Sequence, residues 1–227
     1  ESVQKLGMHL LVLEDTSAKM SPLQAFHSAD FKPYQKRLIN CDFTNAAIWI
    51  KLKVLNHTSD PVLLQVPYAL IDEITFYKIH DGQIIDSLKS GIESDYFKRE
   101  FDHPNYVYDL KLREKESGEY LIRIESDLNI VVPIEIGNYR KVIESNQKLD
   151  FMYGGYCCIF LIMILYNLFL FISTKDRSIL YYILYIPFVC LLQLANSGYL
   201  YKTISYIDVI DPKIILYLLT PIQVYFG

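Results

Sequence analysis

The sequence predicts a mainly β protein: a jelly-roll β-sandwich followed by transmembrane α-helices. Two observations lead to this fold class. Residues 1–150 contain short segments of alternating polarity between charged and turn-forming residues, which is typical of half-buried antiparallel strands. Residues 151–173 contain no charged residue, and about 20 apolar residues in a helix cross a hydrocarbon core of about 30 Å. A water-facing domain is therefore joined to membrane segments.

The clearest strand is predicted at residues 46–56, which alternate in polarity. Ile48 and Ile50 fall on one face of this segment, and Trp49 falls on the other. Residues at every second position of a strand share one face of its sheet. Further strands are expected at residues 62–70, 72–79, 83–89, 106–113, 119–126 and 130–136. Short strands at this spacing favour a sandwich or jelly roll.

Two local signals mark a turn and a helix. Asp81-Gly82 lies between two strand-like segments, and this dipeptide is a strong hairpin signal. Ser21-Pro22 precedes the segment LQAF, which predicts a short helix with Ser21 as its N-cap and Pro22 at its first position.

Three membrane spans are expected, at about 151–173, 179–197 and 213–227, the last one truncated. Residues 1–138 form the predicted β-domain, and residues 139–150 form either a linker or the first turns of a helix entering the membrane. Because the chain begins with Glu1 and ends within an apolar segment, we interpret it as part of a longer membrane protein.

The loops between the spans predict the orientation of the chain. The first loop carries Lys175 and Arg177, whereas Lys202 is the one cation of the second. The positive-inside rule places the first loop in the cytoplasm and the β-domain outside a multi-pass inner membrane. Arg140 and Lys141 argue for the opposite orientation. Long domains translocate largely regardless of charge, so the loops carry more weight.

Composition and motifs exclude several classes of function. The net charge is −4, and there is no basic stripe that would indicate a nucleic-acid partner. The sequence contains no P-loop, HExxH, GxSxG or glycine-rich dinucleotide turn. No His or Cys pair has metal-ligand spacing. We therefore expect no catalytic residue, no metal site and no cofactor in this chain.

The membrane region resembles the first helices of bacterial seven-transmembrane receptors with diverse intracellular signalling modules. The matching positions are Gly154, Gly155, residues 165–170, Asp176, Arg177, Tyr181 and Tyr182. The N-terminal half resembles the second type of extracellular domain in that family, a jelly-roll module likened to carbohydrate-binding domains. The resemblance implies a receptor whose outer domain senses a ligand. Its cytoplasmic module would be a histidine kinase, a diguanylate or nucleotide cyclase, or a phosphatase.

Four aromatic residues are candidates for binding the extracytoplasmic ligand, with a carbohydrate as one option: Trp49, Tyr77, Tyr106 and Tyr108. An exposed indole beside lysines can stack on a sugar ring, as in carbohydrate-binding modules. Packing in the core is the alternative for Trp49, and it is favoured because buried aromatic residues dominate packing energies. Cross-strand pairing is the alternative for the three tyrosines.

Three residues of the first span are expected to contact neighbouring helices. Asn167 is polar within an apolar span, and such groups hydrogen-bond across helices. Gly154 and Gly155 are small, which permits close approach of helices. The spans have membrane lipid as a partner, and the oligomeric state, a homodimer included, is left open. The alternatives to a receptor are a non-signalling carbohydrate- or protein-binding envelope module and a membrane enzyme with an accessory β-domain.

Overall fold

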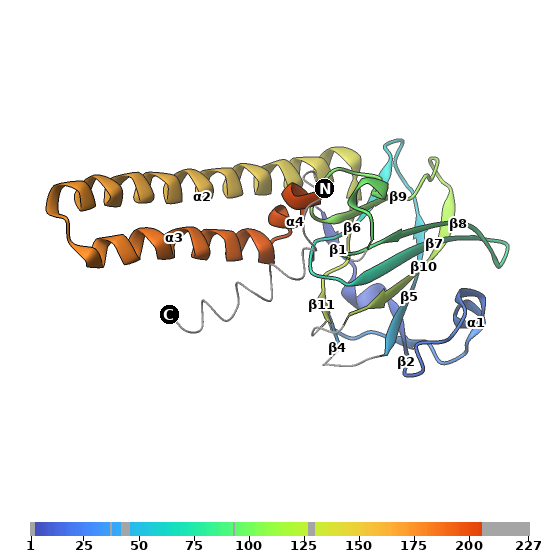
Figure 1. Cartoon of the computed structure of the whole chain (residues 1–227). Coiled ribbons are helices and arrows are strands. Elements are labelled where there is room, and N and C mark those ends of the chain that lie inside the picture. Colours follow the sequence, from blue (N-terminus) through green and yellow to red (C-terminus); the bar gives the residue numbers. More distant parts are fainter. Residues whose placement is uncertain (1–2, 37, 42–45, 93, 127–129, 206–227) are drawn as a thin grey trace. The chain divides into compact units, whose positions relative to one another are not determined.

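The computed structural model describes residues 3–36, 38–41, 46–92, 94–126 and 130–205. The chain divides into two compact units, Glu1–Ile143 and Glu144–Gly227. The first unit is built almost entirely of strands and the second of helices (Figure 1). The predicted order of a β-domain followed by helices is confirmed.

The larger sheet of the first unit has six antiparallel strands. In spatial order they are β3 (Lys32–Pro33), β2 (Leu11–Asp15), β5 (Ala47–Leu55), β10 (Ser117–Glu125), β7 (Glu73–His80) and β8 (Gln83–Ser90). The long strands β5 and β10 lie in the middle of this sheet, and β8 forms one edge.

A second sheet has four antiparallel strands, and a small two-stranded sheet accompanies it. The four strands are, in order, β1 (Gln4–Lys5), β12 (Glu135–Asn138), β6 (Val62–Val66) and β9 (Tyr106–Asp109). The small sheet pairs β4 (Ile39–Cys41) with β11 (Ile130–Val132). Strand β9 is an edge strand of the four-stranded sheet.

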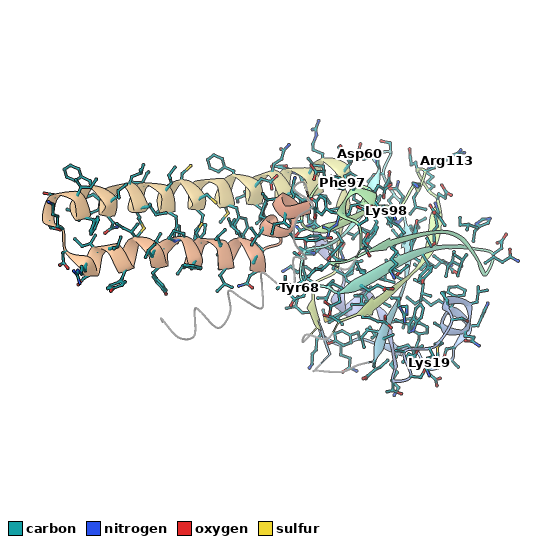
Figure 2. The ribbon with its side chains drawn as sticks, in the orientation of Figure 1. Lys19, Asp60, Tyr68, Phe97, Lys98 and Arg113 are labelled. Carbon is teal, nitrogen blue, oxygen red and sulfur yellow. The ribbon has the colours of Figure 1, made fainter. Side chains whose placement is uncertain are left out.

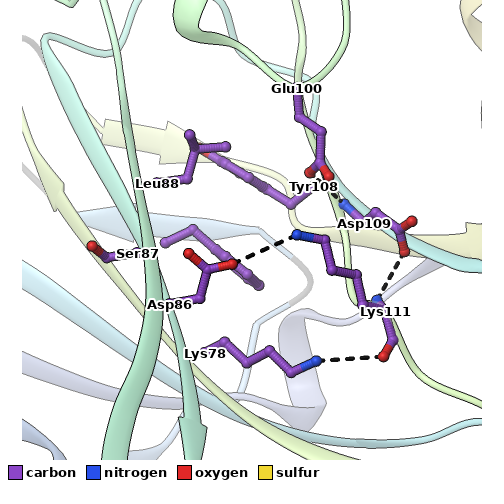
Figure 3. Close-up of a pocket in the computed structure, with 9 residues that line it drawn as sticks. Lys78, Asp86, Ser87, Leu88, Glu100, Tyr108, Asp109 and Lys111 are labelled. Atoms are coloured by element: carbon purple, nitrogen blue, oxygen red, sulfur yellow. Dashed lines mark hydrogen bonds and ion pairs between the residues drawn. The ribbon is translucent and has the colours of Figure 1, made fainter.

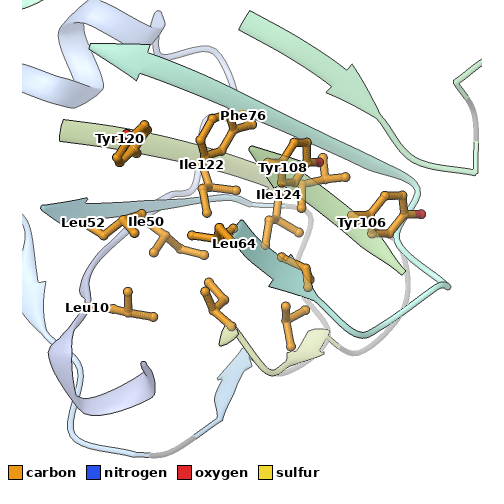
Figure 4. Close-up of a cluster of buried hydrophobic side chains, with 14 of the residues drawn as sticks. Leu10, Ile50, Leu52, Leu64, Phe76, Tyr106, Tyr108, Tyr120, Ile122 and Ile124 are labelled. Carbon is orange, nitrogen blue, oxygen red and sulfur yellow. The ribbon is translucent and has the colours of Figure 1, made fainter. Parts of the chain in front are cut away.

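The main core lies between these sheets, because each contributes its apolar face to one buried cluster (Figure 4). Strands β5, β7 and β10 contribute residues such as Ile50, Phe76 and Ile122. Strands β6 and β9 contribute residues such as Leu64 and Tyr108. The two sheets form a β-sandwich, as the alternating segments predict.

Both local signals are confirmed. Asp81 and Gly82 have φ of 49° and 73° and join β7 to β8, the positive values that a type I′ turn requires. Helix α1 (Pro22–His27) is capped by Ser21. The Ser21 side chain accepts a hydrogen bond from the Gln24 N–H, and the Gln24 side chain accepts one from the Ser21 N–H. The short 3₁₀ helices η1 (Gly7–His9) and η2 (Tyr96–Lys98) complete the unit.

One predicted strand is wrong as a single element. Residues 130–136 form two strands, β11 and β12, which pair with β4 and β6 respectively. Pro133 lies between them. Proline has no N–H to donate to a strand ladder, so the chain leaves one sheet there and enters the other.

The second unit contains most of α2 (Tyr139–Thr174), together with α3 (Arg177–Asn196) and α4 (Tyr199–Ser205). Helices α2 and α3 are long and apolar enough to cross a membrane, and apolar side chains project along both (Figure 2). The Cys190 side chain of α3 lies near the Cys157 side chain of α2. The expected span at 213–227 lies outside the described residues.

The segment that precedes the first predicted span is helical. Residues 139–150 are the first turns of α2, one of the two alternatives that the sequence left open. The helix continues without interruption to Thr174. Within α3, Pro187 is tolerated inside the helix.

Candidate functional site

A hollow of about 290 Å³ lies at the open edge of the β-sandwich (Figure 3). Its walls come from β8, the edge of the six-stranded sheet, and from β9, the edge of the four-stranded sheet. Within the part of the chain that the structure describes, no further strand pairs with either of these two edges, and side chains from both sheets line the same space. Its lining comprises Phe76, Lys78, Asp86, Ser87, Leu88, Glu100, Tyr108, Asp109 and Lys111.

The floor of the hollow is aromatic. Phe76 stacks on Tyr108 with ring centroids 4.7 Å apart and planes 8° apart, and on Tyr120 at 5.4 Å. The Tyr120 hydroxyl donates to the Leu110 carbonyl at 2.7 Å. These rings are buried against one another, so the floor of the hollow is apolar and closely packed.

Charged groups form the rim. The Lys111 ammonium lies 3.6 Å from the Asp86 carboxylate. The Lys78 ammonium donates to the carbonyls of Leu110 and Lys111 at 3.2 and 3.4 Å. Asp86 and Lys111 have more than half of their side-chain surface exposed, so this ion pair is worth at most about 1 kcal/mol and opens at little cost.

The segment that carries the rim is held by hydrogen bonds of its own backbone. The Asp109 N–H donates to the Glu100 carboxylate at 2.9 Å, and the Lys111 N–H donates to the Asp109 carboxylate at 2.8 Å. Lys111 has a φ of 49°, a left-handed conformation that non-glycine residues adopt uncommonly. The chain therefore turns sharply at Lys111, which brings its side chain over the hollow toward Asp86.

This arrangement suits a small ligand rich in hydroxyl groups. Ammonium groups only donate hydrogen bonds and carboxylates only accept them, whereas a hydroxyl does both. Burial raises the pKa of Tyr108, so its phenol stays neutral. Among the described residues, no group of three or more His, Cys, Asp and Glu side chains is arranged to hold a metal ion.

Of the four predicted ligand-binding residues, Tyr108 lines the hollow. Tyr106 is buried in the main core, where its hydroxyl donates to the Ala69 carbonyl at 3.0 Å. Trp49 and Tyr77 stack on each other at 6.1 Å on the opposite face of the six-stranded sheet. Contact between a ligand and any of the four stays a prediction.

Trp49 is fully buried, although it lies on the face of β5 that points away from the main core. Helix α1 covers that face and contributes Ala25 and Phe26 to a second apolar cluster around the indole. The Arg123 guanidinium lies 5.6 Å from the Trp49 ring and also bonds Glu73 and the Ala18 carbonyl. The indole therefore has the packing role that the sequence favoured, and its ring faces are not open to a ligand in this structure.

The predicted helix contacts are placed as follows. The Asn167 amide donates to the Met163 carbonyl of its own helix at 2.8 Å. A Cβ atom added to Gly154 or Gly155 would have no neighbour within 4 Å in the described residues, beyond the nearby backbone of α2 itself. Contacts of these three residues with other helices stay a prediction.

Sequence reasoning missed the residues that shape most of the hollow. Lys78 had the strongest available signal, because it follows Ile74 and Phe76 on the face of β7 that points into the core. A lysine in such a series marks the place where a buried face meets solvent. The other rim residues lie in loops or on an edge strand, and their positions in the sequence show no pattern.

Comparison with known proteins identifies the protein family to which each part of the chain is similar. Residues 7–138 match the family described as 7TMR-DISM extracellular 2. Residues 149–226 match the family described as 7TM diverse intracellular signalling. The chain thus joins an extracellular domain of a sensing type to a transmembrane region.

The chain belongs to the family of seven-transmembrane receptors with diverse intracellular signalling modules. The resemblance seen in the sequence is confirmed. Comparison with curated protein sequences gives no match.

Two solved structures are similar to part of this chain. A β-glucuronidase from Ruminococcus gnavus in complex with D-glucaro-d-lactam is 8% identical with a TM-score of 0.37, covering 60% of this chain and 29% of that one. TmCBM61 in complex with beta-1,4-galactotriose is 9% identical with a TM-score of 0.26, covering 60% of this chain and 83% of that one. Similarity at this level gives no information about ligand or activity.

Proposed function

We propose that this chain is the ligand-sensing and membrane-spanning part of a bacterial signalling receptor, and that its extracytoplasmic domain binds a neutral carbohydrate in the hollow between β8 and β9. Membership of the receptor family supports the sensing role. The observation that carries the ligand class is the alternation of ammonium and carboxylate groups around an apolar floor. Binding is passed to a cytoplasmic output module of the full-length protein.

The balance of charge argues for a neutral ligand. The rim contains two lysines, Lys78 and Lys111, and three carboxylates, Asp86, Glu100 and Asp109. An acidic ligand would meet an excess of negative charge. A cationic ligand would compete with Lys111 for Asp86. A hydroxyl can pair with either sign of group without leaving a desolvated charge.

The test is carbohydrate retention by the whole chain in nanodiscs on an array of neutral oligosaccharides. Lys111→Gln keeps the length of the side chain and removes its charge, and we expect it to weaken binding by about tenfold or more, because a hydrogen bond to a charged group contributes about 1.5–3 kcal/mol. Lys115→Gln is the matched control, since Lys115 is also exposed and also has a positive φ but lies outside the lining.

Two outcomes contradict the ligand class. One is no retention across a broad array, which favours a protein partner for this domain. The other is equal weakening by both lysine variants, which indicates attraction by overall charge rather than a built site. The receptor role is contradicted if the full-length protein carries no signalling module, the result expected for an envelope module that only binds.

A further inference from the structure

One row of residues crosses the four-stranded sheet from the hollow to the start of α2. Asp109 in β9 is the register partner of Leu63 in β6, and Leu63 is the register partner of Gly137 in β12. Asp109 lines the hollow. Gly137 lies two residues before Tyr139, the first residue of α2. Two strand pairings therefore connect the rim of the hollow with the first turn of α2, residues 139–142, which we call the root of this helix.

The first turn of α2 packs onto this row. Val142 is fully buried in a cluster with Leu63 and Val107, and Val107 lies two residues before Asp109 in the same strand. A Cβ atom added to Gly137 would lie 3.2 Å from the Val142 side chain. The root of α2 thus sits directly on the two strands that connect it to the hollow.

Hydrogen bonds fix this root to the sheet. The Tyr139 N–H donates to the Pro61 carbonyl at 2.9 Å, which extends the pairing of β12 with β6 into the helix. The Asn138 side chain accepts a bond from the Lys141 N–H at 3.1 Å and donates to the Asp60 carboxylate at 3.3 Å. A displacement of β6 therefore reaches the helix without crossing a flexible linker.

We propose that filling the hollow displaces β9 and β6. This displacement changes the packing of Val142 against these two strands, so that occupancy of the hollow is transmitted to α2. The contact of Val142 with Leu63 and Val107 is the coupling element. Packed contacts of this kind have discrete arrangements rather than a continuous range. The inference rests on the proposed function only in taking the hollow as the place where the ligand binds.

The test fills the hollow with a covalent probe, so that it needs no knowledge of the natural ligand. The full chain in nanodiscs, with its four native cysteines replaced by alanine, receives Asp86→Cys and is treated with N-ethylmaleimide. Lys89→Cys is the matched control. The two native side chains lie on the same strand and are 58% and 59% exposed, but Lys89 pairs with Glu73 on the other face of the sheet.

The readout is hydrogen–deuterium exchange of the peptide that spans residues 137–143, compared with the same variant before modification. We expect the adduct at residue 86 to change the exchange rate by about threefold or more, and the adduct at residue 89 to leave it unchanged. Adding Val142→Ala reduces the change at residue 86 to less than about twofold. Adding Val12→Ala, a matched truncation in β2 of the other sheet, preserves the change.

Three results overturn the coupling: no change at 137–143 when residue 86 is fully modified, an equal change from the adduct at residue 89, or a response that Val142→Ala leaves intact. The outcome is independent of the carbohydrate test. Carbohydrate retention without a response at 137–143 contradicts only the coupling. A response at 137–143 without carbohydrate retention contradicts only the proposed ligand.

Discussion

The β-domain contains two aromatic clusters that look alike in sequence and differ in what lies beside them. The cluster around Trp49 lies on the outer face of the six-stranded sheet, under α1 and the Arg123 guanidinium. The cluster of Phe76, Tyr108 and Tyr120 lies on the inner face and borders the hollow. A face that points away from the main core is thus buried as well, because α1 covers it. Alternation along a strand assigns a side chain to a face, but what covers that face is decided elsewhere in the chain.

The largest expected effect comes from removing the indole of the covered cluster. Trp49→Ala should lower the free energy of unfolding of the domain by about 3–5 kcal/mol, because it leaves a large cavity under α1. The urea midpoint for proteolysis of the whole chain measures this effect. Phe97→Ala is the control, since Phe97 is 61% exposed and its loss should cost no more than about 0.5 kcal/mol. A cost below about 1 kcal/mol for Trp49→Ala would show that the cluster is not tightly packed.

The second prediction concerns the loop that leads from β2 to α1. Asp15 accepts hydrogen bonds from the Ser17 hydroxyl at 2.6 Å and from the Met20 N–H at 2.9 Å. Burial raises the pKa of Asp15, but these hydrogen bonds outweigh it and hold the pKa below its ordinary value of 3.8. Asp15→Asn should destabilise the domain by about 1–2 kcal/mol at pH 7, because bonds to a charged acceptor are lost.

The pH dependence of that effect follows from the lowered pKa. Between the folded-state pKa and 3.8, the unfolded chain binds more protons than the native one, so the native state gains stability as pH rises. The contribution of Asp15 is complete above 3.8 and is lost as pH falls through the folded-state pKa. The stability difference between the wild-type chain and Asp15→Asn should therefore shrink below pH 3.8. A difference that stays constant down to pH 2 would contradict this origin.

The smallest expected effect is at the cap of α1. Ser21→Ala removes the side chain that accepts from the Gln24 N–H and should cost about 1 kcal/mol. Ser59→Ala, at an exposed position, is the control and should be neutral. Increased exchange of the amides around Trp49 in Ser21→Ala would show that α1 covers the indole. No change there would mean that the sheet alone protects it.

These three variants also sharpen the contrast between the clusters. Each weakens the covered side of the six-stranded sheet, and none touches the lining of the hollow. Carbohydrate retention should therefore stay within about twofold of the wild-type value in the Asp15 and Ser21 variants, since distant independent sites do not couple. A larger loss would indicate that the two faces of the sheet act as one unit.

Features that depend on adjacent residues were predictable from the sequence. The Asp81-Gly82 turn and the Ser21 cap each involve a few neighbouring residues, and both are present. The break at Pro133 was readable in principle, because proline interrupts a ladder, but an apolar segment on both sides concealed it. A turn or a helix cap is formed by residues that are adjacent in the sequence, so it can be predicted without knowledge of the fold.

The hollow could not be predicted in the same way. Its lining extends from Phe76 to Lys111 and joins the edges of two sheets. Strand order and register decide which side chains meet there, and neither is determined by the polarity of one segment. Tyr108 was selected for its aromatic ring, and its place beside the hollow follows from β9 being an edge strand.

The proximity of Cys157 to Cys190 gives the helical unit a native reporter. These two thiols come from α2 and α3, and they lie near each other. A mild oxidant or a short bifunctional thiol reagent would join them at a rate that depends on the spacing and rotation of the two helices. The unmodified receptor can therefore report a movement of its first helix relative to its second by mass spectrometry, with no label added and no residue changed.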